Sequence, residues 1–363
     1  MKKTISVVFC LFIAAMGVLT AVMPKSDYSP TEKRYLATFP DISFSGIADG
    51  SFSVAFEKYL ADHLPFRKAF VTLNSYFEYF KGNNGSGGVY LGKNGTLIEK
   101  PVNDFANFQK NCFAAQEFFA ESGKNVFLCL VPEKGYVLNG LLPKSHLSYN
   151  DDEYLDFASE LGGIRFIDLR NALGSADDFY RTDHHWSSIG AYRGYKAICA
   201  SLGLNPADIS KYTVENTEGF YGTSYGKGCY TFVEPEAISV MKNFETKGKA
   251  RVTITDGGKS TEYDNMFFDE ALETDDKYTV FLNGNHALVT IETGNEGGTL
   301  LLIKDSFAHC LTPFLAENYS EIIMADLRYL NGPISSLIDE ETDDIIILYG
   351  LSTFAESKDI ILY

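Results

Sequence analysis

Short apolar segments alternate with amphipathic ones along most of this chain, and this order restricts the fold more than any other feature. Residues 126–131 and 164–169 are apolar runs of strand length, and amphipathic stretches over 105–121 and 154–161 precede them. The same rhythm returns over 299–349. Apolar strands separated by helices are typical of a parallel sheet that helices cover. We therefore predict an α/β fold with functional groups at the carboxyl ends of its strands.

The first 23 residues indicate a segment that inserts into a membrane. Lys2 and Lys3 precede a stretch without charges over 4–23, which as a helix would be about 30 Å long, the thickness of one bilayer core. The segment indicates a signal anchor or, if it is cleaved, a signal peptide. The positive-inside rule then puts the rest of the chain outside the cytoplasm, anchored in the membrane or secreted.

Three further regions follow from the pattern. Residues 24–50 are polar and bounded by prolines, which predicts a stalk or covering segment. Residues 51–363 carry the α/β pattern. Within them, 212–293 is rich in Gly, Thr, Tyr and turn pairs with alternating apolar residues, so we expect a β-rich insertion there.

The charge balance bears on partners. The 31 Lys+Arg and 48 Asp+Glu give a net charge of −17, and so acidic a chain repels phosphate backbones, which argues against nucleic acid. Without Lys2 and Lys3, 29 basic residues face 48 acidic ones, a net charge of −19. An anionic substrate would need local positive charge at its cleft, for which Lys304 and Arg328 are candidates.

The cysteines indicate neither a complete disulfide framework nor a metal site. Five of the six lie beyond the charge-free stretch, an odd number that cannot pair fully within one chain. There is no C-x-x-C and no Cys/His cluster in the sequence.

The segment Thr182-Asp183-His184-His185-Trp186-Ser187-Ser188 is the first that could carry chemistry. It precedes a helix predicted over 189–202, which Ser187 or Ser188 can cap. A histidine near a helix N-terminus stays neutral and can act as a base, and an adjacent carboxylate can stabilise its imidazolium and fix its tautomer. The alternatives are a hydrogen-bonded loop and a metal site on His184 and His185, although adjacent histidines tend to point apart.

The second segment, over 300–309, ends a predicted strand and begins a helix. Ser306 would lie at the carboxyl end of the sheet beside free helix N–H groups, which suit an oxyanion. The alternatives are that Ser306 caps the helix and that His309 is a rival base or a surface histidine. No G-x-S-x-G elbow surrounds Ser306, so an α/β-hydrolase is not indicated. The two segments support each other because a serine nucleophile needs a base and that base needs an orienting acid.

Taken together, Thr182-Asp183-His184-His185-Trp186 and Lys304-Asp305-Ser306-Phe307 resemble the bacterial DHHW family, relatives of the periplasmic alginate O-acetylation proteins in the SGNH-hydrolase superfamily. The likeness extends to 32–40 (EKRYLATFP) and 62–67 (DHLPFR). It implies an SGNH-hydrolase-like parallel sheet flanked by helices, with Asp183 as orienting acid, His185 as base and Ser306 as nucleophile. Asn285 could donate its amide to an oxyanion, and Arg328 could bind substrate oxygens. The alternatives are that Asn285 is a turn residue and that Arg328 forms a surface ion pair.

The resemblance implies an extracytoplasmic serine O-acyl (O-acetyl) esterase or O-acetyltransferase that acts on a cell-surface or extracellular polysaccharide. It implies no cofactor and no metal, and it allows a membrane-embedded partner that supplies acetyl groups. The alternative is a catalytically inactive, membrane-tethered protein that binds or assembles glycans. Its sugar platform would be the aromatic residues of the β-rich stretch, Tyr212, Phe220, Tyr221, Tyr225 and Tyr230.

Overall fold

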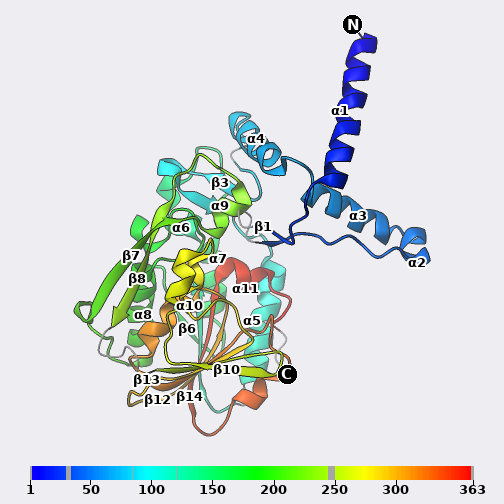
Figure 1. Ribbon diagram of the computed structural model, residues 1–363. Coiled ribbons are helices and arrows are strands. Elements are labelled where there is room, and N and C mark those ends of the chain that lie inside the picture. The colour runs from blue at the N-terminus through cyan, green and yellow to red at the C-terminus, as the bar shows by residue number, and fades with distance from the viewer. Residues whose placement is uncertain (1, 30–33, 84, 121, 244–249, 361–363) are drawn as a thin grey trace.

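The predicted alternation of strands and helices forms an eight-stranded sheet with helices on both faces (Figure 1). The computed structural model describes residues 2–29, 34–83, 85–120, 122–243 and 250–360. From one edge to the other, the strands of the sheet are β10 (Lys259–Tyr263), β9 (Arg251–Asp256), β11 (Leu288–Glu292), β13 (Tyr319–Ala325), β12 (Gly298–Lys304), β14 (Thr342–Gly350), β5 (Asn125–Val131) and β6 (Arg165–Ile167).

The middle of the sheet is parallel, as the sequence predicts. β13, β12, β14, β5 and β6 all run in the same direction. Side chains alternate between the faces, so Val126 and Leu128 enter one apolar cluster while Phe127 and Cys129 enter the other. The first face is covered by α5 (Phe105–Phe119), α7 (Asp151–Ser159) and α11 (Leu351–Glu356), and the second by α8 (Ser188–Leu202) and α10 (Ala308–Leu315). Burial on both faces explains why these strands are continuous apolar runs.

The β-rich residues 212–293 divide between two sheets. β7 (Tyr212–Phe220) and β8 (Glu236–Asn243) form an antiparallel pair of their own, whereas β9, β10 and β11 extend the central sheet as an antiparallel edge. The alternating residues of β9 and β11 account for this, because Val252, Ile254, Val289 and Ile291 are all buried in the main core. The central sheet is therefore mixed, with the parallel part predicted and the antiparallel edge not.

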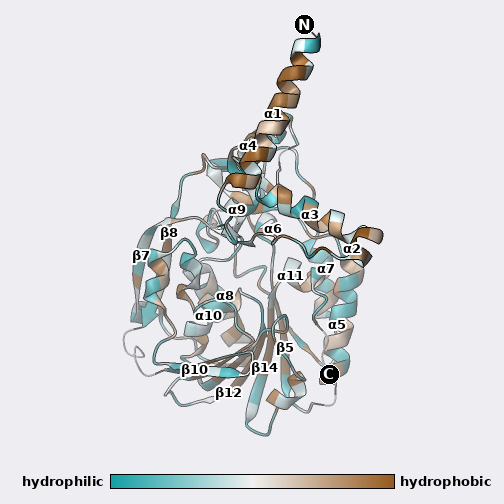
Figure 2. Ribbon diagram, turned by 45° about the vertical axis from the view of Figure 1, so that its right-hand side comes forward, coloured by the Kyte–Doolittle hydropathy of each residue, from teal (hydrophilic) through white to brown (hydrophobic). Residues whose placement is uncertain are grey.

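The N-terminal helix α1 (Lys2–Val22) extends away from the sheet and is apolar along its length (Figure 2). Among the described residues, it is the one helix long and apolar enough to cross a membrane, with a mean hydropathy of 2.6 over Lys3–Val22. This finding fits the predicted signal anchor or signal peptide.

Two segments that resemble the DHHW family lie against each other near the start of the chain. The Asp62 carboxylate accepts a hydrogen bond of 2.8 Å from the Ala37 amide, and the His63 Nε2 atom lies 2.9 Å from the Ala37 carbonyl oxygen. Glu32 and Lys33, at the start of the first segment, lie outside the described residues. These hydrogen bonds tie the Asp-His pair at 62–63 to the backbone of Ala37 in the first segment.

The remaining elements lie outside the central sheet and the helices that cover it. Two further antiparallel pairs occur, β1 (Tyr28–Ser29) with β2 (Arg34–Tyr35), and the predicted hairpin of β3 (Val89–Leu91) with β4 (Leu97–Glu99). The other α-helices are α2 (Phe44–Ala48), α3 (Ser51–Asp62), α4 (Arg67–Phe80), α6 (Lys134–Val137) and α9 (Thr223–Gly228). Single 3₁₀ turns occur at Lys93–Gly95, Asn139–Leu141, Ala176–Asp178, Ile209–Lys211, Asp269–Glu273, Lys277–Val280 and Ile334–Leu337.

Candidate active site

Asp183, His185 and Ser306 meet at the carboxyl end of the parallel strands. Ser306 lies two residues after the end of β12, and the other two residues lie in the loop before α8. The Ser306 Oγ atom lies 2.7 Å from His185 Nε2, and His185 Nδ1 lies 2.6 Å from Asp183 Oδ1. These hydrogen bonds join, in order, a hydroxyl, an imidazole and a carboxylate, which is the geometry that activates a serine.

Four hydrogen bonds hold the Asp183 carboxylate in one orientation. Oδ1 accepts from the backbone amide of His185 (2.8 Å) as well as from its ring, and Oδ2 accepts from the Thr223 amide (2.6 Å) and hydroxyl (2.8 Å). Asp183 is only 1% exposed. A Cβ atom at Gly222 would collide with the carboxylate, so a glycine lets the α9 segment approach this closely. An ionised Asp183 accepts a hydrogen bond from the Nδ1–H group, which keeps the ring proton on Nδ1 and leaves Nε2 free to take the serine proton.

Aromatic side chains fix the position of the His185 ring. The Tyr278 ring stacks on it at a centroid distance of 4.3 Å and an angle of 9°, and the Tyr278 hydroxyl donates to the Ser306 carbonyl oxygen (3.2 Å). Trp186, which is fully buried, donates from Nε1 to the Phe307 carbonyl oxygen (2.9 Å). Residues beside the base therefore bind the backbone carbonyl groups of the nucleophile and of the residue after it, and the motif's tryptophan couples the two segments.

The turn that carries Ser306 is held by its neighbour Asp305. The two carboxylate oxygens of Asp305 accept from the amides of Phe307 (2.9 Å) and of Gly350 (2.9 Å), the last residue of β14. Phe307, not Ser306, is the N-cap residue of α10, and the serine side chain points to His185 instead. Ser306 is thus not a helix cap, whereas Ser187 does cap α8, as predicted, by accepting from the Gly190 amide.

Lys304 and His309 lie where the sequence does not predict them. Lys304 is 1% exposed, and its Nζ atom lies 3.0 Å from Asp326 Oδ2 and 2.9 Å from His309 Nε2. His309 is also buried, and burial together with the Lys304 charge holds its pKa well below the usual value. The prediction that Lys304 supplies positive charge to the cleft is wrong, because this charge is neutralised beneath the site. His309 is neither a surface residue nor a rival base, since its Nε2 lone pair accepts from Lys304.

Arg328 and Asn285 lie beside this buried group. Arg328 binds both oxygens of Asp326 (2.8 and 2.6 Å) and donates to Asn285 Oδ1 (3.3 Å). Among the described residues, neither side chain has a hydrogen bond to Ser306, His185 or Asp183. The predicted ion pair of Arg328 is present, and the guanidinium also lines a cleft beside the site.

Three residues at the site are not predicted from the sequence. Tyr278 and Thr223 are described above, and the third is the buried Lys134, which follows β5. Its ammonium group donates to the carbonyl oxygens of Leu97 (2.7 Å), Tyr180 (2.6 Å), Arg181 (3.1 Å) and Asp183 (2.9 Å). Burial lowers the pKa of Lys134 to about 8. Its place at the carboxyl end of an apolar strand is a sequence signal that could have identified it.

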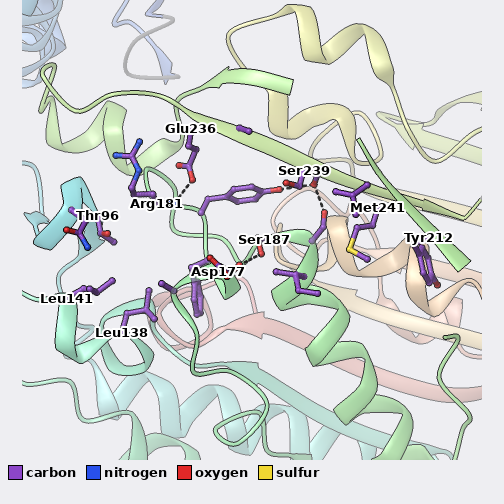
Figure 3. Close-up of a pocket in the computed structure, with 18 of the residues that line it drawn as sticks. Thr96, Leu138, Leu141, Asp177, Arg181, Ser187, Tyr212, Glu236, Ser239 and Met241 are labelled. Carbon is purple, nitrogen blue, oxygen red and sulfur yellow. Dashed lines mark hydrogen bonds between the residues drawn. The ribbon is translucent and has the colours of Figure 1, made fainter. Parts of the chain in front are cut away.

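Cavities lie on both sides of the motif loop. A cleft of about 310 Å³ is lined by polar residues from end to end: Glu99, Lys100, His184, Lys227, Arg328, Ser352, Thr353, Glu356, Ser357 and Asp359. His184 and Phe307 also line a small cavity of about 30 Å³. On the other side, a cavity of about 550 Å³ (Figure 3) is lined by Tyr180, Arg181, Ser187 and Ser188 and by the β7–β8 pair, and none of the three candidate catalytic residues lines it. None of the three lines the polar cleft either, but His184, the chain neighbour of Asp183 and His185, does, and His184 and Phe307, the neighbour of Ser306, both line the small cavity.

The two histidines of the motif lie close together. Their ring centroids are 3.9 Å apart, so the expectation that they point apart is wrong. Asp183, His184 and His185 could each offer a ligand atom to a metal, with these atoms within 4.8 Å of one another. However, both Asp183 oxygens and both His185 nitrogens are already in hydrogen bonds. A metal bound there would have to break the Ser306–His185–Asp183 chain.

Comparison with known proteins agrees with the resemblance seen in the sequence. Residues 154–325 match the family model described as DHHW protein, a segment that contains Asp183, His185 and Ser306. The probable alginate O-acetylase AlgJ of Pseudomonas aeruginosa is 26% identical over 201 residues, which are 47% of this chain and 51% of AlgJ. The chain thus spans about half the length of this curated relative.

Solved structures share the fold. A DHHW family protein from Eubacterium siraeum superposes with a TM-score of 0.66 at 24% identity, covering 76% of this chain and 94% of that one. Bacillus cereus PatB1, in a structure with a sulfonyl adduct, gives a TM-score of 0.63 at 19% identity, covering 74% of this chain and 96% of its own. The resemblance to the DHHW family and the α/β fold are both confirmed.

Proposed function

We propose that this chain, which carries a DHHW segment, is an SGNH-type serine O-acyl esterase or O-acetyltransferase that acts on a polysaccharide outside the cytoplasm. The observation that carries the proposal is the continuous hydrogen-bond chain from Ser306 Oγ through His185 to Asp183. Each element has its required partner: the base reaches the nucleophile, and the acid holds the base in the tautomer that can take a proton.

The reaction follows from these contacts. His185 Nε2 takes the proton of Ser306 as Oγ attacks the carbonyl carbon of an O-acetyl ester, and the tetrahedral intermediate then expels the sugar oxygen, which receives that proton. The second half repeats the steps with water or a sugar hydroxyl as nucleophile, and Ser306 regains its proton. Asp183 stabilises the imidazolium in both halves, and its orientation depends on Thr223.

A polysaccharide substrate is supported by two observations. The cleft beside the site presents charged groups and hydroxyls that can hydrogen-bond sugar hydroxyls. The curated relative is named a probable alginate O-acetylase. Arg328 lines this cleft and remains our candidate for binding substrate oxygens. We also retain Asn285 as the oxyanion donor, since Arg328 occupies its amide oxygen and leaves the amide N–H groups for substrate.

The location outside the cytoplasm is supported by α1, which would anchor the chain in the membrane or direct its secretion. An enzyme tethered in this way could receive acetyl groups from a membrane-embedded partner. This partner is part of the proposal for the transferase and is not needed by the esterase.

The test is the release of 4-nitrophenol from 4-nitrophenyl acetate. Wild-type protein should release it in a burst equal to the enzyme concentration if acetyl-Ser306 accumulates, and Ser306→Ala should abolish both burst and turnover. Ser201→Ala, on the exposed side of α8, is the matched control and should behave as wild type. Turnover retained by Ser306→Ala would overturn the nucleophile assignment. A folded wild-type protein without any activity would favour the inactive glycan-binding alternative.

A further inference from the structure

His184 has no part in the hydrogen-bond chain of the proposed mechanism, yet it lies in direct contact with it. Its ring is 3.9 Å from that of His185 and 5.8 Å from that of Phe307, centroid to centroid. It also lines both the polar cleft of about 310 Å³ and the small cavity beside Phe307. Any molecule in the polar cleft that reaches Ser306 has this ring in its wall.

The two nitrogens of the His184 ring have different surroundings. Nδ1 is inaccessible to water and has no hydrogen-bond partner among the described residues, although it lies 3.4 Å from Asp183 Oδ1 and 3.8 Å from Glu99 Oε1. The side chain as a whole is 27% exposed. Because Nδ1 contributes nothing to this exposure, the accessible edge of the ring is the one that carries Nε2.

The surroundings also select the tautomer. Burial, reinforced by the neighbouring His185, lowers the pKa of His184 to about 4, so the ring is neutral at neutral pH. A single ring proton is then stabilised on Nδ1, where two carboxylates face it, and a lone pair there would be repelled by them. Nε2 is left as a hydrogen-bond acceptor toward the cleft.

Glu99 is fixed in the position that this arrangement needs. Its carboxylate binds Lys227 Nζ through both oxygens (2.9 and 2.8 Å) and accepts from the Ser224 hydroxyl (3.1 Å). Burial acts to raise the pKa of Glu99, but the His184 ring, Lys227 and Ser224 outweigh it and lower the pKa. The carboxylate is therefore charged, and it faces the Nδ1 side of His184.

We propose that His184 Nε2 accepts a hydrogen bond from a hydroxyl of the acceptor sugar that neighbours the reacting hydroxyl. This inference rests on the proposed function and specifies its substrate class, namely acceptors with two adjacent hydroxyls. The reacting hydroxyl gives its proton to His185, whereas the neighbouring hydroxyl donates its hydrogen bond to His184. The two histidines therefore have separate partners. His184 is a binding residue for the second half of the reaction, and acylation of Ser306 does not require it.

The test compares two acceptors that differ in one donor. Wild-type protein is acetylated by 4-nitrophenyl acetate in the presence of 1,2-ethanediol or 2-methoxyethanol, and the acetate ester of each is measured against free acetate. Counted per hydroxyl group, the diol should be preferred by about tenfold, since one hydrogen bond to Nε2 is worth about 1.4 kcal/mol. His184→Ala should bring the ratio near one, and because the two acceptors compete for the same acetyl-Ser306, this ratio is independent of any change in the rate of acetylation.

Three variants separate this binding role from a structural one. His184→Gln offers an amide oxygen to the cleft and should restore part of the preference for the diol, which a packing role would not predict. Glu99→Gln should weaken the preference because it removes the charge that favours the Nδ1 proton. His146→Ala changes an exposed histidine outside the cleft and should have no effect.

The outcomes distinguish the two proposals. If the wild-type burst is present and His184→Ala retains the preference for the diol, the role of His184 is refuted and the serine mechanism stands. An equal use of both acceptors by wild-type protein refutes it as well. If wild-type protein shows neither a burst nor turnover of 4-nitrophenyl acetate, the serine mechanism itself fails.

Discussion

Lys134 supports the candidate site from below, and its replacement gives a quantitative test of the structure. The ammonium group is fully enclosed and donates to four backbone carbonyls, of which three belong to the motif loop at Tyr180, Arg181 and Asp183. Lys134→Met keeps the aliphatic stem but leaves these carbonyls without a donor. The ammonium group has three N–H donors, so at about 1 kcal/mol for each the loss is about 3 kcal/mol, and relief from burying a charge reduces it to about 2 kcal/mol.

The assay is urea unfolding at neutral pH, followed by far-ultraviolet circular dichroism. Lys93→Met is the matched control, because Lys93 also donates to one carbonyl oxygen, that of Gly140, but does so at the surface. The control should lose less than about 0.5 kcal/mol. A loss below about 1 kcal/mol for Lys134→Met would refute the reasoning, since it would mean that the four contacts do not hold the loop.

Three further variants probe the site and its surroundings. Asp183→Asn should lower kcat for 4-nitrophenyl acetate by about 10³-fold or more with little change in KM, because the amide cannot stabilise imidazolium; a loss below about tenfold would refute the role of the acid. Trp186→Phe should lower the free energy of unfolding in urea by about 2 kcal/mol, since it leaves the Phe307 carbonyl oxygen without a hydrogen-bond donor; an unchanged midpoint would contradict this. Burial and the neighbouring Asp151 carboxylate raise the pKa of Glu133, so the folded chain holds a proton that the unfolded chain has released. Stability should therefore fall as the pH rises from about 5 to about 9, and Glu133→Gln should flatten the decline in thermal midpoint; parallel curves for the two proteins would exclude Glu133 as the cause.

The sequence is sufficient to predict the parts of the site whose signals are local. Two short motifs stand out because one lies before a predicted helix and the other at the end of a predicted strand, and the resemblance to the DHHW family selects Asp183, His185 and Ser306 within them. The structure brings them within hydrogen-bond distance. The parallel part of the sheet was predicted for a similar reason, since burial on both faces leaves a continuous apolar run.

Residues were missed or misplaced where long-range packing decides. Lys304 and His309 were expected to be exposed because charged and titratable residues usually are, but they are buried and bind each other. Thr223 reaches Asp183 across 40 positions, and no pattern near residue 223 reports this contact. The antiparallel edge of the sheet was missed because alternation in β9 and β11 predicts strands without predicting their partners.

The Asp305–Gly350 hydrogen bond has a consequence for motion. It joins the turn of the nucleophile to the end of β14, a central strand that is paired on both sides. Opening this turn would break a contact with the most protected part of the sheet, so the turn should belong to the same cooperative unit as the core. The Gly350 amide should then exchange its hydrogen with solvent about as slowly as the amides within β14. We therefore expect any movement that opens the polar cleft to come from the surrounding loops and not from the turn that carries Ser306.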